Sequence, residues 1–132
     1  MPVKDAAKNV PQLCTRFHYA SELIGRRWNG AIIFMLLKQT CRFATLRDNI
    51  PGITDRMLSE RLQELELVEI VARTVVPETP VRVEYSLTAK GSALAVPVNA
   101  IAAWAHDWME TKAPPRRTAA RSSARRARQS RS

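Results

Sequence analysis

The most informative part of the sequence is residues 43–65, which read FATLRDNIPGITDRMLSERLQEL. Apolar residues recur at helical spacing on both sides of Pro51-Gly52, and this dipeptide forces a turn. Thr54 is placed to cap the second helix by accepting a backbone hydrogen bond, and Asp55 suits the positive end of the helix dipole. The pattern therefore predicts two helices joined by a tight turn.

The helix that follows Thr54 is expected to reach about Val68 and to have two different faces. Its core-facing residues are Leu58, Leu62 and Leu65, and its opposite face carries Arg56, Ser59, Glu60 and Gln63. Arg pairs with guanine, Gln with adenine, and Ser bonds to either base, so the polar face is a candidate for base contacts. The alternatives are a solvated helix face and, for Glu60, a role in orienting Arg56 one turn away.

Helices are also predicted before this unit, because residues 17–24 and 28–37 have helical apolar spacing on either side of Gly25. A short helix is expected over residues 43–50. The segment 28–37 is apolar almost all round, which is typical of a central, buried helix.

Strands are predicted after the capped helix. Residues 70–76 are rich in β-branched side chains, and residues 82–87 alternate between apolar and polar. Residues 77–81 contain no glycine for a two-residue turn and are expected to project as a loop. A last helix is expected from Thr88 to about Glu110, with a bend at Pro97.

This order of elements is that of a winged helix-turn-helix, an α+β fold that is mainly helical. In this fold the helix after the turn enters the major groove of DNA, and the hairpin loop reaches the backbone or the minor groove. Arg42 is a candidate for a phosphate contact and Arg82 for a minor-groove contact, with surface salt bridges as the alternative for both. Arg61 flanks the buried stripe and is expected to pair with Glu64 or Glu66. The competing interpretation of the whole pattern is an unrelated small α+β domain.

The net charge of +9 over 132 residues lies mostly in the C-terminal tail. Residues 112–132 contain eight basic and no acidic residues, which leaves 13 basic against 12 acidic in the rest of the chain. The tail has no aromatic residue and is predicted to be disordered. Its charge favours attraction to phosphates, so the folded part has to be assigned by its pattern.

Several classes of protein are excluded by the composition. Two cysteines, Cys14 and Cys41, are too few for a secreted disulfide framework. No apolar run approaches the length of a membrane span and no signal peptide is evident, so a cytoplasmic protein of one domain is expected. No nucleophile–base constellation, phosphate loop or carboxylate pair indicates an enzyme. His18 and His106 are too scattered to bind a metal, and no cofactor is expected.

Four strings resemble the HxlR-type winged-helix transcriptional regulators. They are LIGRRW (23–28) after Cys14, RFATL (42–46) with IPGIT (50–54), MLSERLQEL (57–65), and VPETPVRVEYSLTAKG (76–91). The resemblance runs from residue 14 to about 110 without a gap. Glu69 and Gln39 stand where the family usually has glycines that end helices in a left-handed conformation, which leaves these two helix ends open.

The resemblance implies a bacterial repressor or activator that binds near-palindromic DNA operators as a homodimer. The dimer is expected to form through the first and last helices. It divides the chain into a polar arm (1–13), the family's domain (14–110) and an Arg-rich tail (111–132). Candidate interface residues are Phe17, Leu23, Ile101, Trp104 and Trp108. The alternative for these residues is a core within one monomer, although a monomer would leave part of the last helix's apolar stripe exposed.

Cys14 suggests a more specific function. Some members of the family use the matching cysteine to sense oxidants or electrophiles, through thiol modification or an intersubunit disulfide. Cys14 precedes the first helix, where the helix dipole and Arg16 favour the thiolate. The alternatives are an inert thiol at the dimer seam, a regulator that answers another, unidentified small molecule, and a nucleic-acid or protein interaction module driven by the Arg-rich tail.

Overall fold

The computed structural model describes residues 12–110. The expected tail over 111–132, and all but the last two residues of the expected arm over 1–13, lie outside the described residues. The chain forms two compact units, and the second begins at Val96. The first unit contains the helices predicted before the hairpin and the hairpin itself, and most of the last predicted helix belongs to the second unit.

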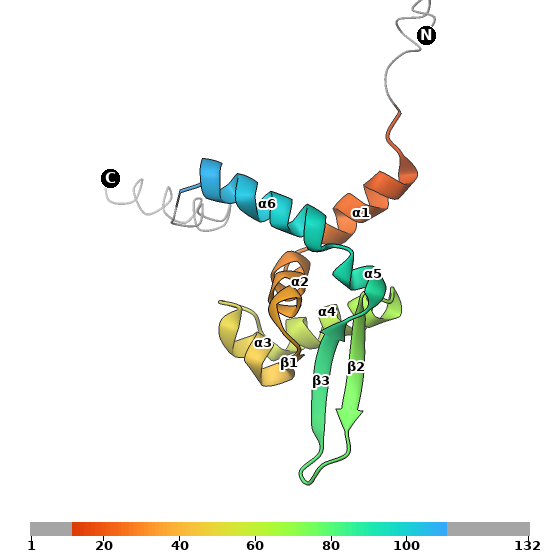
Figure 1. Ribbon diagram of the computed structural model, residues 1–132, viewed down its shortest axis with the longest axis vertical. Helices are drawn as coiled ribbons and strands as arrows, with labels where there is room; N and C mark the ends of the chain where they lie inside the picture. The colour runs from red at the N-terminus through yellow and green to blue at the C-terminus, as the bar shows by residue number, and fades with distance from the viewer. Residues whose placement is uncertain (1–11, 111–132) are drawn as a thin grey trace, which may run out of the picture. The chain divides into compact units, whose positions relative to one another are not determined.

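The first unit opens with two helices, α1 (Thr15–Gly25) and α2 (Asn29–Lys38). As predicted, α1 ends at Gly25 and α2 is central, because Ile32 and Ile33 are fully buried. By contrast, α1 has no buried residue and extends away from the other helices of its unit (Figure 1).

The predicted helix-turn-helix is formed by α3 (Phe43–Asn49) and α4 (Asp55–Leu67). Gly52 in the connecting turn has a φ of 84°, a left-handed conformation that glycine adopts without steric cost. The Oγ1 atom of Thr54 accepts a hydrogen bond of 3.1 Å from the backbone N–H of Met57. The expected cap of the second helix is therefore confirmed.

The sheet contains β1 (Cys41–Arg42), β2 (Val71–Val76) and β3 (Arg82–Leu87), all antiparallel, in the order β1-β3-β2. The hairpin of β2 and β3 was predicted and forms the wing, which projects with its loop at the far end (Figure 1). A third strand, β1, was not predicted. The third strand has two residues, too few to show alternation, and its Cys41 pairs with Tyr85 far along the chain.

The single bent helix expected after Thr88 was wrong. The structure has two helices, α5 (Ala89–Ser92) and α6 (Ala95–Trp108). Pro97 has no N–H, and its ring would clash with the carbonyl four residues earlier in a continuous helix. It lies instead in the first turn of α6, where its missing N–H has no cost.

Glycine is required within α5. A Cβ atom at Gly91 would collide with the backbone carbonyl oxygen of Ile70. The close approach allows α5 to pack against the end of the sheet, where Thr88 caps it by accepting from the N–H of Gly91 at 3.1 Å.

The two helix ends that lack the family's glycine have different backbone conformations. Glu69 adopts the left-handed conformation itself, with a φ of 62°, and the N–H of Ile70 closes α4 on the carbonyl of Leu65 at 2.9 Å. Gln39 follows α2 in an extended conformation, with φ −169°, so no glycine is needed there. Both helix ends, which the sequence left open, are therefore formed without glycine.

The core of the first unit joins the second, third and fourth helices to the base of the wing. Its buried apolar residues include nine large side chains, Ile32, Ile33, Leu36, Leu46, Leu58, Leu62, Leu65, Ile70 and Val71. Three of the nine are leucines of α4 that lie on one face of the helix. The core therefore packs against that face of α4. None of the helices between residues 12 and 110 has both the length and the hydropathy needed to cross a bilayer.

Candidate DNA-binding surface

The two faces of α4 are separated as the sequence predicted. Leu58, Leu62 and Leu65 are buried, while Arg56 and Gln63 are exposed and Ser59 and Glu60 are half-buried. Positions three and four apart share one face of a helix, so these four polar residues form one outward surface, with the cap Thr54 exposed at its beginning. This set, with Thr54, is called the recognition face below.

Arg56 and Glu60 are paired on the recognition face. The Nε atom of Arg56 lies 3.2 Å from Oε1 of Glu60, one turn along the helix, which is the contact required by the alternative role of Glu60 in orienting Arg56. The Arg56 side chain is 87% exposed. An exposed pair of this kind contributes little to stability, so the guanidinium can exchange its carboxylate partner for a base edge or a phosphate at low cost.

Arg47 is a residue that the sequence pattern did not single out. It belongs to α3, and its Nε lies 3.1 Å from Asp48 while its Nη1 lies 3.7 Å from Asp55, the first residue of α4. The hydrogen bond and the charge of Asp48, with a smaller effect of Asp55, raise the pKa of Arg47 above its ordinary value. The polar residues of 43–50 were the only signal that could have indicated it.

Arg82 braces the base of the wing. Its Nη1 lies 3.2 Å from Oε2 of Glu78, and its Nε lies 2.8 Å from Oε1 of Glu84 without the alignment of a hydrogen bond. The Arg82 side chain is only 29% exposed. Within the wing it therefore forms the salt bridges that were the alternative to a minor-groove contact.

Arg42 lies close to this brace. It pairs with Glu84 in the β1–β3 ladder, and it lines a groove of about 360 Å³ together with the wing loop and Arg82. The Arg42 side chain is exposed, and it forms no ion pair with any residue between 12 and 110. The structure thus brings Arg42 and Arg82 together between α3 and the wing.

Arg61 is buried rather than flanking. The residue is 7% exposed, and its Nη1 lies 3.3 Å from Oε1 of Glu64. Of the two partners expected for it, Glu64 is therefore the one it contacts.

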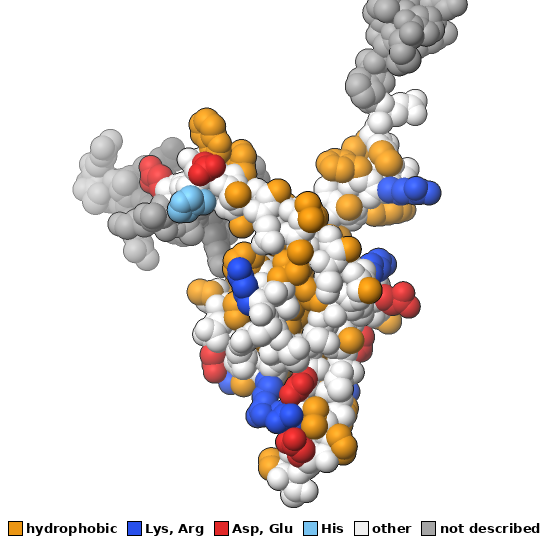
Figure 2. Space-filling model, viewed as in Figure 1, with side chains coloured by type: hydrophobic (Ala, Val, Ile, Leu, Met, Phe, Trp, Pro, Cys, Tyr) orange, Lys and Arg blue, Asp and Glu red, His pale blue; other side chains and the backbone are white. Residues whose placement is uncertain are grey.

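The residues proposed for a dimer interface are mostly at the surface. Phe17 on α1 is 63% exposed, and on α6 Trp104 and Trp108 are 59% and 76% exposed. Ile101 is also exposed, while Leu23 is half-buried. Figure 2 shows hydrophobic side chains at the surface of α1 and also at that of α6. Among residues 12–110, these exposed side chains are therefore not part of the buried core.

The two thiols have different environments. Cys14 is exposed at the N-cap position of α1. Cys41 is buried in β1, and its burial raises the pKa of the thiol, although an interaction with the side chain of Gln39 partly opposes this. The Sγ atom also donates a weak hydrogen bond of 3.4 Å to the backbone carbonyl of Gln39. Among the described residues no three His, Cys, Asp or Glu side chains are grouped to hold a metal ion.

Known proteins share both the sequence and this arrangement. Residues 23–113 match the family model described as HxlR-like helix-turn-helix. The transcriptional regulator YodB of Bacillus subtilis is 47% identical over 98 residues, 74% of this chain and 88% of that protein. An uncharacterised regulator of the same organism, YvaP, is 46% identical over 102 residues, 77% of this chain and 94% of that protein.

Solved structures agree with these matches. The reduced form of YodB has a TM-score of 0.67 at 45% identity and covers 77% of this chain and 100% of its own. A quinone-bound form of YodB has a TM-score of 0.63 at 42% identity, covering 73% and 100%. HypR, a redox regulator in its oxidised form, has a TM-score of 0.69 at 33% identity and covers 73% of this chain and 99% of its own.

These relatives are helix-turn-helix regulators, a class of protein that is generally not enzymatic. The family model matches the segment that carries α2, the turn, the recognition face and the wing. The chain belongs to the HxlR-like helix-turn-helix family of DNA-binding transcriptional regulators.

Proposed function

We propose that the protein regulates transcription from the cytoplasm by binding a near-palindromic operator as a homodimer, with one recognition face in the major groove of each half-site. The observation that carries the proposal is the outward surface of α4. Arg56 and Gln63 are exposed there, directly opposite a fully buried leucine stripe. Because the buried side fixes the helix, the side chains of the outward surface are available for base edges.

Contacts to the DNA backbone are assigned to residues at the margin of α4. Arg42 is exposed at the start of α3 and is suited to a phosphate. Arg82 is already held by Glu78 and Glu84, so its role is to fix the shape of the wing that approaches the duplex. The recognition face then supplies sequence preference, and these flanking arginines supply register.

A second copy of the chain is the proposed partner of α1. This helix has 11 residues, none of them buried, and isolated helices of that length are marginal in water. Its exposed Phe17 and the exposed tryptophans of α6 form apolar surfaces of the kind that mark protein interfaces. A symmetric dimer would cover them and would read two half-sites about 10 base pairs apart, centre to centre.

Selection of DNA from randomised duplexes tests the proposal. The full-length protein is expected to enrich an inverted repeat, and its mass in solution is expected to be that of a dimer. Enrichment of a single unpaired half-site would contradict the dimer but not the recognition face. Failure to enrich any sequence would contradict the operator proposal itself.

A second function, thiol sensing through Cys14, is favoured by the position of this residue. Cys14 is exposed at the beginning of a helix proposed to lie in the dimer interface, whereas Cys41 is buried with a raised pKa. HypR is a redox regulator, and YodB occurs in reduced and quinone-bound forms. An oxidant or a quinone that modifies Cys14 would therefore alter the interface.

The test of sensing compares Cys14→Ser with Cys41→Ser. Treatment with the thiol oxidant diamide is expected to release the selected operator from wild type and from Cys41→Ser, but not from Cys14→Ser. Release that persists in Cys14→Ser would assign the response to Cys41 or to no thiol.

The Arg-rich tail, which lies outside the described residues, is proposed to add attraction to phosphates without reading sequence. Replacing its eight basic residues by Gln is expected to flatten the salt dependence of binding while the preference for the operator remains. Loss of the preference together with the tail would instead favour an interaction module driven by the tail.

A further inference from the structure

A cluster of three charged residues connects α4 to a distant part of the chain. Glu64, on α4, receives two hydrogen bonds from Arg26, one from Nε and one from Nη2, both of 2.9 Å. It also receives the Nη1 group of Arg61 at 3.3 Å. Arg26 is 38 positions away in the sequence, so this cluster is a tertiary connection rather than a local helix pair.

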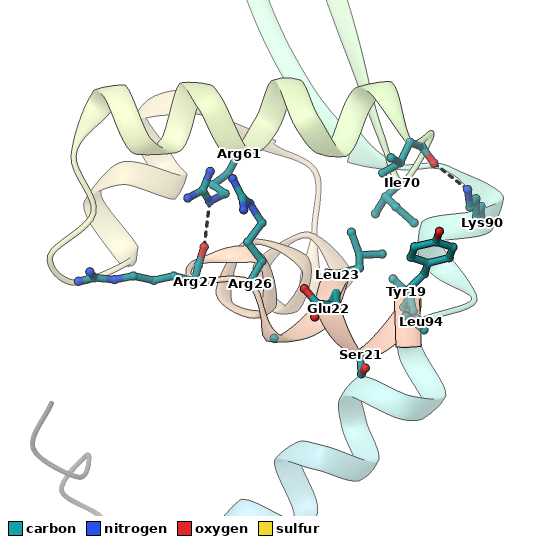
Figure 3. Close-up of a pocket in the computed structure, with 13 residues that line it drawn as sticks. Tyr19, Ser21, Glu22, Leu23, Arg26, Arg27, Arg61, Ile70, Lys90 and Leu94 are labelled. Atoms are coloured by element: carbon teal, nitrogen blue, oxygen red, sulfur yellow. Dashed lines mark hydrogen bonds between the residues drawn. The ribbon is translucent and has the colours of Figure 1, made fainter. Parts of the chain in front are cut away.

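The cluster also includes a backbone contact. The Nε of Arg61 donates a hydrogen bond of 3.0 Å to the carbonyl oxygen of Arg27. Figure 3 shows this bond, with Arg26 and Arg61 close together between the two segments and on one wall of a groove beside α1. The segment between α1 and α2 is thus attached to α4 through both a side chain and the main chain.

The electrostatics of the cluster depend on Glu64. Two guanidinium groups converge on one carboxylate, and the Arg61 side chain is only 9% exposed. A buried cation requires a close counter-charge, and Glu64 is the acidic residue that both arginines contact. Without it, two like charges would face each other between α4 and the segment that follows α1.

Glu64 is adjacent in sequence to Gln63 of the recognition face and three residues from Arg61 of the buried face. It therefore lies on the flank of α4, at the third turn of a helix of 13 residues. A shift of this flank would rotate the recognition face, because a helix moves as a rigid body. Arg26 is also the C-cap residue of α1, so a displacement at the end of α1 acts directly on the partner of Glu64.

We infer that Glu64 is a positioning residue for DNA recognition, which fixes the rotation of α4 by joining Arg26 and Arg61 and thereby couples the end of α1 to the recognition face. This inference rests on the proposed binding of an operator by α4. It assigns to Glu64 no contact with DNA.

The test uses Glu64→Gln in the full-length protein, with Glu66→Gln as the matched control. Both variants remove one negative charge from α4, but Glu66 is exposed and forms no ion pair with the other described residues. The readout is the ratio of affinities for the selected operator and a scrambled duplex, which cancels the general effect of charge. Glu64→Gln is expected to lower this ratio about tenfold, within the range for residues of one network, and Glu66→Gln to leave it unchanged.

A second substitution separates positioning from a loss of folding. If two uncompensated guanidinium groups cause the defect, Arg26→Gln in the Glu64→Gln background should partly restore the ratio, whereas independent sites would add their losses. Circular dichroism of each variant confirms that the folded protein is compared. Equal ratios for Glu64→Gln and Glu66→Gln, or additive losses in the double variant, would overturn the inference. A wild-type protein with no preference for any duplex would instead refute the operator proposal on which it rests.

Discussion

The two faces of α4 show how one short helix serves stability and recognition separately. The inner face carries three leucines and Arg61, all buried, and its charged group is satisfied by Glu64 and a backbone carbonyl. The outer face carries Arg56, whose only ion pair among residues 12–110 is an exposed contact to Glu60. Each arginine is paired with a glutamate, but Arg61 is buried and Arg56 is exposed, which gives the two pairs different consequences.

The difference follows from the environment of each charge. An exposed ion pair contributes little and is easily exchanged, whereas the buried guanidinium of Arg61 cannot lose Glu64 without remaining as a desolvated charge. Substitutions on the inner face should therefore change the free energy of unfolding, and those on the outer face should change DNA binding with little effect on unfolding.

The largest effect is expected from Leu62→Ala on the inner face. Leu62 is 2% exposed, and truncation would leave a cavity, which lowers the free energy of unfolding by about 2 to 5 kcal/mol. Urea denaturation measures this change. Leu67→Ala serves as the control, because Leu67 lies on the same helix but is 83% exposed, and its truncation should change stability by about 0.5 kcal/mol or less. Similar losses for both leucines would contradict the assignment of the faces.

A smaller effect, on binding alone, is expected from Arg56. Arg56→Ala should weaken operator binding by about 1 to 3 kcal/mol and relax the preference at one base pair, because it would remove the proposed bidentate hydrogen bond to a guanine. Arg56→Lys keeps the charge but not the planar fork, so it should also relax the preference while the salt dependence stays unchanged. Competition binding with single-base operator variants gives both quantities. If Arg56→Lys kept the full preference for the operator base pair, the proposal that Arg56 recognises a base would be wrong.

The smallest of these effects is expected at the beginning of α4, where Thr54 belongs to the recognition face but also caps the helix. Thr54→Ala removes the acceptor for the N–H of Met57 and should lower the free energy of unfolding by about 1 kcal/mol. Thr54→Ser retains the hydroxyl and should be close to wild type in the same thermal or urea denaturation. Equal losses in the two variants would show that the threonine methyl group, not the cap, is what matters.

Much of this architecture could be predicted because it is encoded locally. The helix-turn-helix follows from Pro51-Gly52, the cap at Thr54 and the leucine spacing, and the wing follows from alternation over residues 82–87. The same local pattern separated the exposed Arg56 from the buried leucines. The Arg56–Glu60 contact was also predictable, because its partners are one helical turn apart.

What could not be predicted depends on contacts between distant residues. The two-residue strand β1 exists only through its pairing with β3, and Arg26 meets Glu64 only when α1 and α4 are folded together. The buried guanidinium of Arg61 donates a hydrogen bond to the backbone carbonyl of Arg27. This contact between distant residues produces no periodic pattern in the sequence. At Pro97 a bend was expected, but the chain instead forms two helices, with Pro97 in the first turn of the second. The sequence pattern alone did not show where this second helix begins.

The relative affinity of the full-length protein for its selected operator and for a scrambled duplex, at physiological salt, bears on all of these points. A recognition face held by the core predicts a preference of about a thousandfold or more for the operator, and this preference should fall in Arg56→Ala without a change in the urea midpoint. Equal affinity for the two duplexes would contradict the account, because binding would then come from charge alone and α4 would not read sequence.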